Sequence, residues 1–378
     1  MDLGLTEIQQ MLKTSAQDFL SRECPLTLVR EMEEDQQGYT DGLWRQMGAL
    51  GWTGVAFPEQ YGGTGGNFAD LGVLLEEIGR SLAPSPFVST VVLGGMTILD
   101  GGSDNQKKDL IGRICSGGMT MTLAVNEASA TYEAWGIEAT AREQGGNYEI
   151  TGTKLFVPDA HAADMIIVAA RTSSDRDPAK GITLFLVPSG TAGLRITPLR
   201  SVGNERVFEV DLDKVSVPQD AVIGKVGEGW PTVERTIMRA TAAQCIEMLG
   251  GAQAVLDMTV EYAKGRTQFG RPIGSFQAVQ HHCARMATDV EGSKNIAYQA
   301  VWRLSEGLPA QREVAMAKAW IGPAYRRVCA TAHQCHGAIG FTKEHDLQLY
   351  TRRAKVHELT YGDANHHKEI ALQHVHDE

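Results

Sequence analysis

Two changes in the spacing of apolar residues divide this chain of 378 residues into three blocks, and the order of the blocks limits the possible folds. In residues 5–110 the apolar side chains recur every three or four positions, which is typical of amphipathic helices. Residues 119–226 instead contain alternating and β-branched runs between Gly, Asp and Pro, and these runs predict strands. After Gly229 the helical spacing returns, and no proline interrupts residues 233–271.

The three blocks predict three domains with limits at 1–118, 119–228 and 229–378. A length of about 150 residues per domain is usual, so the chain length is consistent with two or three units. We find no internal repeat and no flexible linker, so the blocks are expected to form one compact protomer. Within the first block, Pro58 and the glycine pairs in residues 62–66 predict a structured loop.

Charge and hydropathy exclude several classes of protein. The chain has 35 Lys and Arg against 46 Asp and Glu, a formal net charge of −11, and this field opposes binding to a polyanion. We therefore expect no nucleic-acid partner. No apolar run approaches the roughly 20 residues of a membrane helix, and the N-terminal segment is amphipathic rather than signal-like. These features predict a cytoplasmic protein with no membrane span.

The cysteines and histidines do not predict a metal site. Six cysteines are scattered without a CxxC pair or another spacing typical of zinc, so we expect reduced, mostly buried thiols. Eleven histidines are present, and four of them lie near the carboxyl terminus. There, a solvated helix end is favoured over a cation site.

Three motifs carry the chemical information. They are LWRQMGALGWTGVAFPEQYGGTGG at 43–66, GRTQFGRPIGSFQAVQHH at 265–282 and QCHGAIGFTKEHDLQLYTRRAK at 334–355. In order and spacing they resemble the acyl-CoA dehydrogenase family, and the resemblance covers nearly the whole chain. The implied fold is α+β, with an N-terminal α-helical domain, a middle β-barrel-like domain and a C-terminal four-helix bundle. The implied activity is FAD-dependent α,β-desaturation of an acyl-CoA thioester.

The resemblance also implies contacts to the dinucleotide half of FAD, which in this family lies across a subunit interface. Arg266 would face the pyrophosphate, because a guanidinium can bridge two phosphate oxygens. Phe269 and Gln277 would follow as an apolar wall and an amide contact. Gln334 would contact the nucleotide from the other side, and Gly337 would allow close backbone approach.

The part of the family pattern that holds the flavin ring is less well matched. The family's Thr-Glu-Pro-Gly-Ala-Gly-Ser-Asp segment aligns with residues 126–133, where Thr131 and Tyr132 replace a glycine and a serine. The family's Trp-Ile-Thr motif aligns with residues 156–158. Phe156 could still cover a flavin face, but Pro158 has neither a hydroxyl nor an N–H to donate.

The usual catalytic base is also missing. In many family members a Glu removes the α-proton, and the aligned position is Gly362. Asp363 is the neighbouring acid and our candidate base, although its side chain is shorter and offset by one residue. Some relatives place the Glu on the long helix, but Ala240 and Thr241 stand there, with Glu247 about two helical turns further on.

Three functions are consistent with this pattern. The first is a subunit of a heteromeric acyl-CoA dehydrogenase, a heterotetramer of the type that degrades steroid side chains, in which a homologous chain supplies the base. The segment Tyr361–His367 is similar to such chains. The second is a self-sufficient homo-oligomer with an unusual base, and the third is a non-redox binding or scaffold protein. An active complex of this family would pass electrons to an electron-transfer flavoprotein.

Overall fold

The computed structural model describes residues 4–376, and these residues form two compact units. The first unit contains the chain up to Glu31, Phe68–Ala83 and the residues from Thr241 on. The second contains Met32–Asn67 and Pro84–Ala240. Neither unit is continuous in sequence, because the first takes in helices from both ends of the chain.

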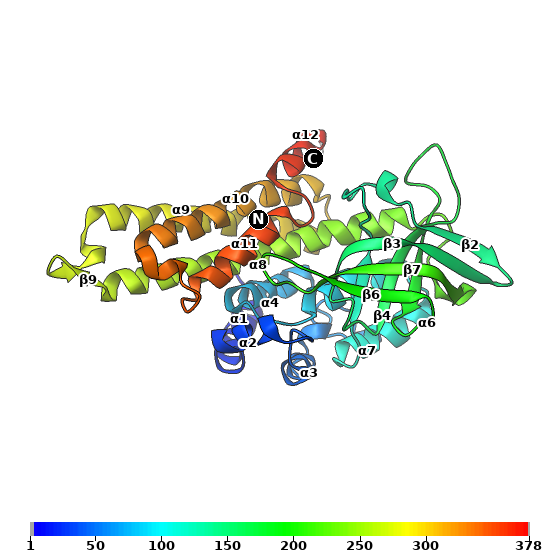
Figure 1. The fold of residues 1–378 in the computed structure, drawn as a ribbon, viewed down its shortest axis with the longest axis horizontal. Coiled ribbons are helices and arrows are strands. Elements are labelled where there is room, and N and C mark those ends of the chain that lie inside the picture. The colour runs from blue at the N-terminus through cyan, green and yellow to red at the C-terminus, as the bar shows by residue number, and fades with distance from the viewer. Residues whose placement is uncertain (1–3, 377–378) are drawn as a thin grey trace. The chain divides into compact units, whose positions relative to one another are not determined.

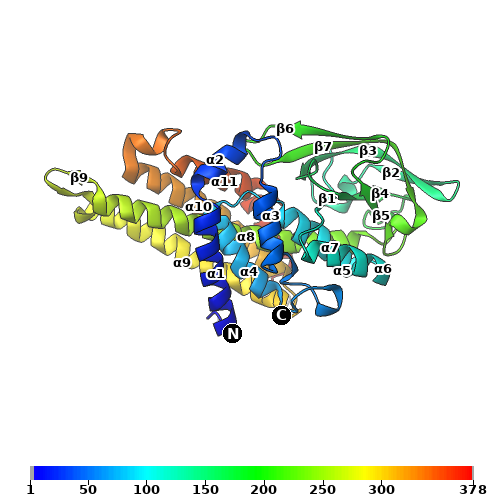
Figure 2. The same cartoon turned by 90° about the horizontal axis from the view of Figure 1, so that it is seen from below.

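The first unit is helical. Its helices are α1 (Glu7–Glu23), α4 (Phe68–Ser81), most of α8 (Trp230–Gly265), α9 (Gln277–Ser305), α10 (Gln311–His336), α11 (Leu347–Leu359) and α12 (Ala364–Gln373), and α2 (Leu26–Glu34) begins in it. The short strands β9 (Thr267–Gln268) and β10 (Arg271–Pro272) form a hairpin between α8 and α9, and 3-10 turns follow at Ile273–Ser275 and Gly337–Phe341. Helices α9, α10 and α11 lie side by side, and the hairpin projects from one end of the α8–α9 pair (Figures 1 and 2).

Local sequence signals explain where these helices begin. The Thr6 side chain accepts a hydrogen bond from the Gln9 backbone N–H at 3.2 Å, and the Gln9 side chain accepts one from Thr6 at 3.1 Å. This reciprocal pair satisfies two N–H groups that would otherwise lack partners at the start of α1. Asp363 caps α12 in a similar way, because its Oδ1 accepts from the N–H groups of Asn365 and His366.

Helices α4 and α8 cross at two glycines. A Cβ atom at Gly250 would lie 1.9 Å from the carbonyl oxygen of Glu76, and one at Gly79 would lie 2.2 Å from that of Glu247. No larger residue fits at this spacing. The Glu76 carboxylate is itself buried and accepts from Lys13 Nζ, at 2.5 Å. The first unit is therefore packed around a close backbone contact as well as an apolar core.

The second unit contains a sheet of eight strands. They are β1 (Met121–Ala124), β2 (Thr140–Gln144), β3 (Asn147–Pro158), β4 (Met165–Arg171), β5 (Ile182–Pro188), β6 (Leu194–Leu199), β7 (Val207–Pro218) and β8 (Val222–Ile223). The strand order is β6-β7-β3-β2-β4-β5-β8, and β1 pairs with β4 (Figure 2). The pairs are antiparallel, except that β4 is parallel to β1 and, at one residue, to β2. The middle strands β4 and β5 are almost fully buried.

Short helical segments complete the second unit. They are α3 (Asp41–Ala49), α5 (Met96–Gly101), α6 (Asp104–Gln106), α7 (Gly112–Cys115), π-helices at Val88–Gly95 and Lys107–Ile111, and 3-10 turns at Trp52–Gly54, Glu59–Tyr61, Ala134–Gly136 and Gln219–Ala221. The predicted structured loop around Pro58 is confirmed. The Phe57 side chain in this loop is fully buried, and a Cβ at Gly63 would lie 2.0 Å from the Phe57 carbonyl oxygen. The glycine is needed because the chain folds directly back onto itself.

The predicted helical, β and helical order is confirmed. All six cysteines are free in the structure, and Cys24, Cys115, Cys245 and Cys329 are buried. The domain limits at 118/119 and 228/229 stay a prediction, since the compact units combine segments from several blocks. Among residues 4–376, no helix is both long enough and apolar enough to cross a membrane.

Candidate functional site

A buried ion pair fixes the loop that precedes β2 in the second unit. Lys154, on β3, is fully buried, and its Nζ lies 2.5 Å from Glu127 Oε1 and 3.2 Å from the Val125 carbonyl oxygen. Glu127 also accepts from the backbone N–H groups of Glu138 and Ala139, at 3.0 and 3.1 Å. Burial lowers the pKa of Lys154 to about 8, although the Glu127 carboxylate opposes this change. The pair joins both ends of the loop to the sheet.

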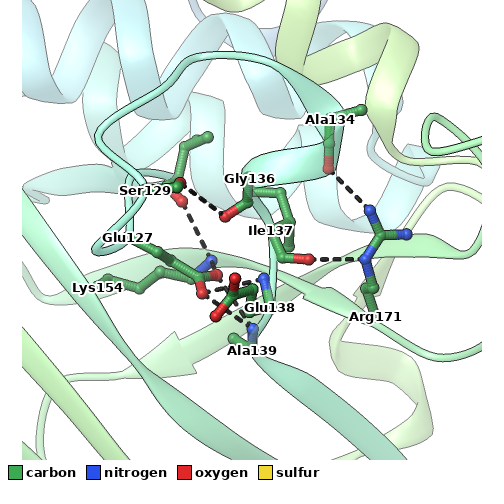
Figure 3. A network of polar contacts seen from close by, with 10 residues as sticks. Glu127, Ser129, Ala134, Gly136, Ile137, Glu138, Ala139, Lys154 and Arg171 are labelled. Atoms are coloured by element: carbon green, nitrogen blue, oxygen red, sulfur yellow. Dashed lines mark hydrogen bonds and ion pairs between the residues drawn. The ribbon is translucent and has the colours of Figure 1, made fainter.

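Arg171 holds the same loop from the end of β4. Its Nε donates to the Ile137 carbonyl oxygen at 2.6 Å, and its Nη2 donates to that of Ala134 at 2.8 Å (Figure 3). Further bonds reach the carbonyl oxygens of Pro178 and Lys180. One guanidinium therefore satisfies four backbone acceptors, two in this loop and two in the segment before β5.

Two side chains of this loop pack against Gly136. A Cβ at Gly136 would lie 2.4 Å from Thr131 Cγ2 and 2.8 Å from Ser129 Oγ. Ser129 also donates to the Gly136 carbonyl oxygen at 3.3 Å, a contact drawn in Figure 3. Ala130 has a left-handed φ of 53°, which closes the turn. In the segment that aligns with the family's flavin loop, Ser129 and Thr131 thus pack against Gly136, while residues 128–130 are exposed.

Phe156 stands out from β3 because the strand contains a bulge. Tyr148, Ile150 and Lys154 alternate inward along β3, but the pairing with β7 shifts between Lys154 and Val157. This shift leaves Phe156 with a φ of 54° and a side chain that is 54% exposed. An aromatic face is therefore available at this position.

In the first unit, the polar side chains predicted to bind the dinucleotide are not engaged by other described residues. Arg266 follows the last turn of α8, Gln277 opens α9, and Gln334 lies near the end of α10; all three are exposed. Within residues 4–376, none of the three side chains has a hydrogen bond or an ion pair. Phe269, at the tip of the hairpin, is 92% exposed with a φ of 53°.

A stacked pair of rings brings two of these segments together. Tyr262, on the last turn of α8, lies with its ring centroid 4.4 Å from that of His336, and its hydroxyl donates to the His336 carbonyl oxygen at 3.4 Å. The turn that bears Gln334 and Gly337 therefore lies beside the end of α8, close to Arg266. His336 Nε2 is buried and has no hydrogen-bond partner among the described residues. Gly337 has a φ of 65°, and no atom lies within 4 Å of a Cβ built there.

In the segment aligned with the family's base, the base position is a glycine and the neighbouring acid caps a helix. Gly362 has a φ of 99°, and a Cβ added there would lie 2.3 Å from the His366 ring. Asp363 is exposed, and the hydrogen bond from the His366 N–H lowers the pKa of its carboxyl below the ordinary value. The structure thus gives Asp363 an evident role as a helix cap.

Two buried lysines and one arginine were not predicted as important. Besides Lys154 and Arg171, Lys318 on α10 is 1% exposed, and its Nζ donates to Gln244 Oε1 at 2.6 Å and to the His357 carbonyl oxygen. Burial lowers the pKa of Lys318 to about 8. A sequence signal existed for Lys154, because it shares the inward phase of Tyr148 and Ile150 on β3. Nothing in the sequence separates Lys318 from a surface lysine.

Family comparisons cover most of the chain. Residues 6–118, 122–215 and 227–376 match the models described as the N-terminal, middle and C-terminal domains of acyl-CoA dehydrogenase. A relative, the probable acyl-CoA dehydrogenase YngJ of Bacillus subtilis, is 31% identical over 369 residues, which are 96% of each chain. Within residues 4–376, no group of three or more His, Cys, Asp and Glu could hold a metal ion.

Two solved structures share the fold over almost their full length. Butyryl-CoA dehydrogenase from Megasphaera elsdenii is 28% identical with a TM-score of 0.92, covering 99% of this chain and 100% of the other. A chain of the ChsE4-ChsE5 complex from Mycobacterium tuberculosis is 30% identical with a TM-score of 0.90, covering 100% of both. The helical, β and helical architecture is thus the one that these proteins share.

Proposed function

We propose that this chain, which belongs to the acyl-CoA dehydrogenase family of FAD-dependent oxidoreductases, is one subunit of a heteromeric acyl-CoA dehydrogenase. In this proposal it contributes contacts to the dinucleotide half of the FAD of a homologous partner chain, and the partner supplies the base. The observation that carries the proposal is an asymmetry: the side chains for the dinucleotide are present and free, whereas those for the flavin ring and the base are replaced.

The residues of the first unit fit the dinucleotide. Arg266 has no partner within the described chain, and a guanidinium donates to two phosphate oxygens at once. Gln277 and Gln334 can each donate and accept through their amides, which suits ribose and adenine. The open space at Gly337 permits close backbone approach to a ligand. These four residues would hold the cofactor together with the exposed ring of Phe269.

The residues of the second unit do not fit the flavin ring in the same way. Phe156 offers an exposed aromatic face, but Pro158 has no N–H to donate. The loop at Thr131 is closed by its own packing against Gly136. A buried polar edge left without donors costs about 1–3 kcal/mol per group, which disfavours a flavin ring held by this chain.

The state of the acid near the base position supports the same division of work. Asp363 Oδ1 is engaged by two backbone N–H groups at 3.0 and 2.9 Å, and its lowered pKa makes it a weaker proton acceptor. A bound FAD would supply the acceptor for the hydride equivalent that leaves the acyl chain. The electrons would then pass to an electron-transfer flavoprotein. The substrate class is an acyl-CoA thioester, and the resemblance of Tyr361–His367 favours a bulky, sterol-type acyl group in a heterotetramer.

The experiment compares flavin content in the assembled complex. This chain is co-expressed with a homologous partner gene, and the FAD-to-protein ratio is measured for wild type, Arg266→Ala and Arg285→Ala. Arg285 is a matched control, because it is an exposed arginine on α9 without a hydrogen bond or ion pair in the described chain. We expect Arg266→Ala to lose most of the flavin and Arg285→Ala to keep it. Full occupancy in the Arg266→Ala complex would contradict the proposal.

Flavin content, measured for the chain alone and together with its partner, distinguishes the three functions. Close to one FAD per chain, with turnover, would favour the self-sufficient homo-oligomer. About half a flavin per protomer that appears only with the partner supports the heteromer. Absence of flavin beside every homologous partner would favour the binding or scaffold protein.

A further inference from the structure

Three histidines lie beside the turn that follows α10. His336 is the last residue of this helix, His333 lies three residues earlier, and His345 stands just before α11. The His336 and His345 rings meet edge to face, with their centroids 4.8 Å apart. A Cβ built at Gly340, inside the turn Gly337–Phe341, would lie 3.1 Å from His336 Cβ and 3.2 Å from His333 Nδ1. These three residues, here called the histidine cluster, therefore form one group beside the turn.

Two further rings connect the histidine cluster to its surroundings. Tyr262 of α8 stacks on His336 with a centroid distance of 4.4 Å, and Phe341 stacks on His333 at 4.5 Å. Phe341 is itself the last residue of the turn, whereas His336 directly precedes Gly337, the first. Both ends of the turn are thus held through contacts of imidazole rings.

Hydrogen bonds place one proton on each imidazole. His336 Nδ1 lies 2.9 Å from a backbone carbonyl oxygen of α10, which only accepts, so this nitrogen donates. The Thr351 hydroxyl gives its single proton to the Leu347 carbonyl oxygen, and it therefore accepts from His333 Nε2, at 2.9 Å. His345 Nδ1 accepts from the Leu347 N–H at 3.1 Å, so its own proton is on Nε2. These bonds suit three neutral rings.

Burial and mutual repulsion oppose a positive charge on the histidine cluster. Burial lowers the pKa of His336 below its ordinary value of 6.5, and the neighbouring His345 and His333 lower it further, although the bond to the backbone carbonyl oxygen opposes the change. Burial and the neighbouring His345 also lower the pKa of His333. A proton on His345 Nδ1 would end its bond to the Leu347 N–H.

The neighbouring elements supply little charge that could balance a protonated ring. α8 presents the Tyr262 ring to the histidine cluster, and α11 presents the Thr351 hydroxyl. Asp346, the acid at the start of α11, lies 2.7 Å from Arg30 Nη2 on α2 and is thereby paired. The two charged residues at 343–344 are exposed. Protons on two rings of the cluster would therefore place like charges in contact.

We propose that the histidine cluster is a pH-sensitive clamp, which positions the turn Gly337–Phe341 while its rings are neutral and releases it at acidic pH. An open turn exposes the rings of His333 and His336 to water, where they regain their ordinary pKa. The open turn then binds more protons than the closed one, so its population rises as the pH falls below 6.5. Between pH 7.5 and 5.5 each of these two rings can raise the ratio of open to closed turn by up to about tenfold.

The consequence for the cofactor rests on the proposed function. Gln334 and Gly337, which we assign to the nucleotide, stand at the start of this turn, so release of the turn would weaken their contacts to FAD. The opening of the turn itself depends only on the residues of this chain. The two events can therefore be measured separately.

Hydrogen exchange followed by mass spectrometry measures the opening in the complex assembled with the homologous partner. Protection of residues 337–347 is determined at pH 7.5 and pH 5.5, relative to the chemical exchange rate of each amide at that pH. The Gly337 N–H, which donates to the His333 carbonyl oxygen, and the Leu347 N–H report on the clamp directly. We expect this protection to fall by about ten- to a hundredfold in the wild type.

His333→Gln and His336→Phe each remove one titrating ring. Glutamine keeps a donor for Thr351, and phenylalanine keeps the stack on Tyr262. Each variant should reduce the fall in protection by up to about tenfold, and the double variant should remove most of it. His376→Gln, at an exposed histidine near the carboxyl terminus, is the control and should keep the wild-type fall. A fall of less than about twofold in the wild type, or a fall of wild-type size in the double variant, overturns the proposal.

The flavin content of the same samples is the second readout. If the turn carries the nucleotide contacts, the wild-type complex loses FAD at pH 5.5 and the double variant keeps it. A fall in protection without loss of FAD supports the clamp and contradicts the assignment of Gln334 and Gly337. Unchanged protection, in a complex that still loses FAD on Arg266→Ala, overturns the clamp and leaves the proposed function standing.

Discussion

Replacing Glu127 by glutamine tests the buried ion pair that fixes the loop before β2. Lys154 has two acceptors, and the variant removes the charged one, which leaves a buried ammonium with the Val125 carbonyl oxygen and a neutral amide. Removal of one partner from a buried pair costs about 3–5 kcal/mol of unfolding free energy. Lys154 can reduce this cost by releasing its proton, so the penalty must depend on pH.

The size of that dependence follows from the pKa of Lys154. At about 8 it lies one unit above pH 7, and one unit corresponds to about 1.4 kcal/mol. We therefore expect Glu127→Gln to cost about 3 kcal/mol at pH 7. At pH 9 the lysine is largely neutral in both proteins, and the penalty should fall to about 1 kcal/mol, the value of one hydrogen bond.

The wild-type protein should show the corresponding trend. The pKa of Lys154 is lowered from 10.5 to about 8, so the unfolded chain binds more protons than the folded one between these pH values. Lys154 therefore increases the free energy of unfolding as the pH rises from about 8 to 10.5, and it gives no such increase below pH 8.

The assay is urea denaturation at pH 7 and pH 9 of wild type, Glu127→Gln, Lys154→Met and the double variant. Because the two residues share one interaction, the double variant should lose about 1–3 kcal/mol less than the sum of the single losses. Glu138→Gln, an exposed carboxylate in the same loop, is the control and should change little. Additive losses, or an equal penalty for Glu127→Gln at both pH values, would refute the reasoning.

Two further outcomes follow from individual residues. Asp363→Asn should keep both the turnover of the assembled complex and the start of α12, because asparagine also caps helices. Asp363→Ala should instead lower the unfolding free energy by about 1 kcal/mol. A near-complete loss of turnover in Asp363→Asn would show that this chain supplies the base. Gly250→Ala should lower the Tm by at least several degrees, since its Cβ meets the Glu76 carbonyl oxygen, while Gly265→Ala, with no atom within 4 Å, is the control in the same melting experiment. Equal Tm values for these two glycine variants would show that α4 and α8 can separate at little cost.

The order of the blocks could be predicted from the sequence because it depends on local periodicity. The spacing from Val233 onward predicts the long helix α8, and the alternation around Ile150 predicts β3; both are present. The cap at Asp363 was also readable, since Asp before a helical run is a usual N-cap. The site residues themselves stay predictions, because their role depends on a cofactor and a partner.

The features that were not predicted arise from contacts distant in sequence. Glu127 and Lys154 are 27 residues apart, and only the register of β3 brings them together. The exposure of Phe156 depends on a bulge in β3. Regular alternation along the strand would place this side chain inward. His336 meets His345 through the packing of α10 against α11 and the segment before it. Periodicity identifies faces of single elements, but not which polar atoms face one another across them.

The discontinuous first unit has a consequence for synthesis on the ribosome. Its early helices, α1 and α4, emerge long before Thr241, at which the remainder of that unit begins. At 5–20 residues per second, translation of the intervening segment takes on the order of ten seconds. The second unit ends at Ala240 and can be completed within this interval, while buried side chains such as Leu71 and Leu74 of α4 still lack their later neighbours. The nascent chain therefore exposes this apolar surface until its last third has been made. A chaperone would be needed during this interval.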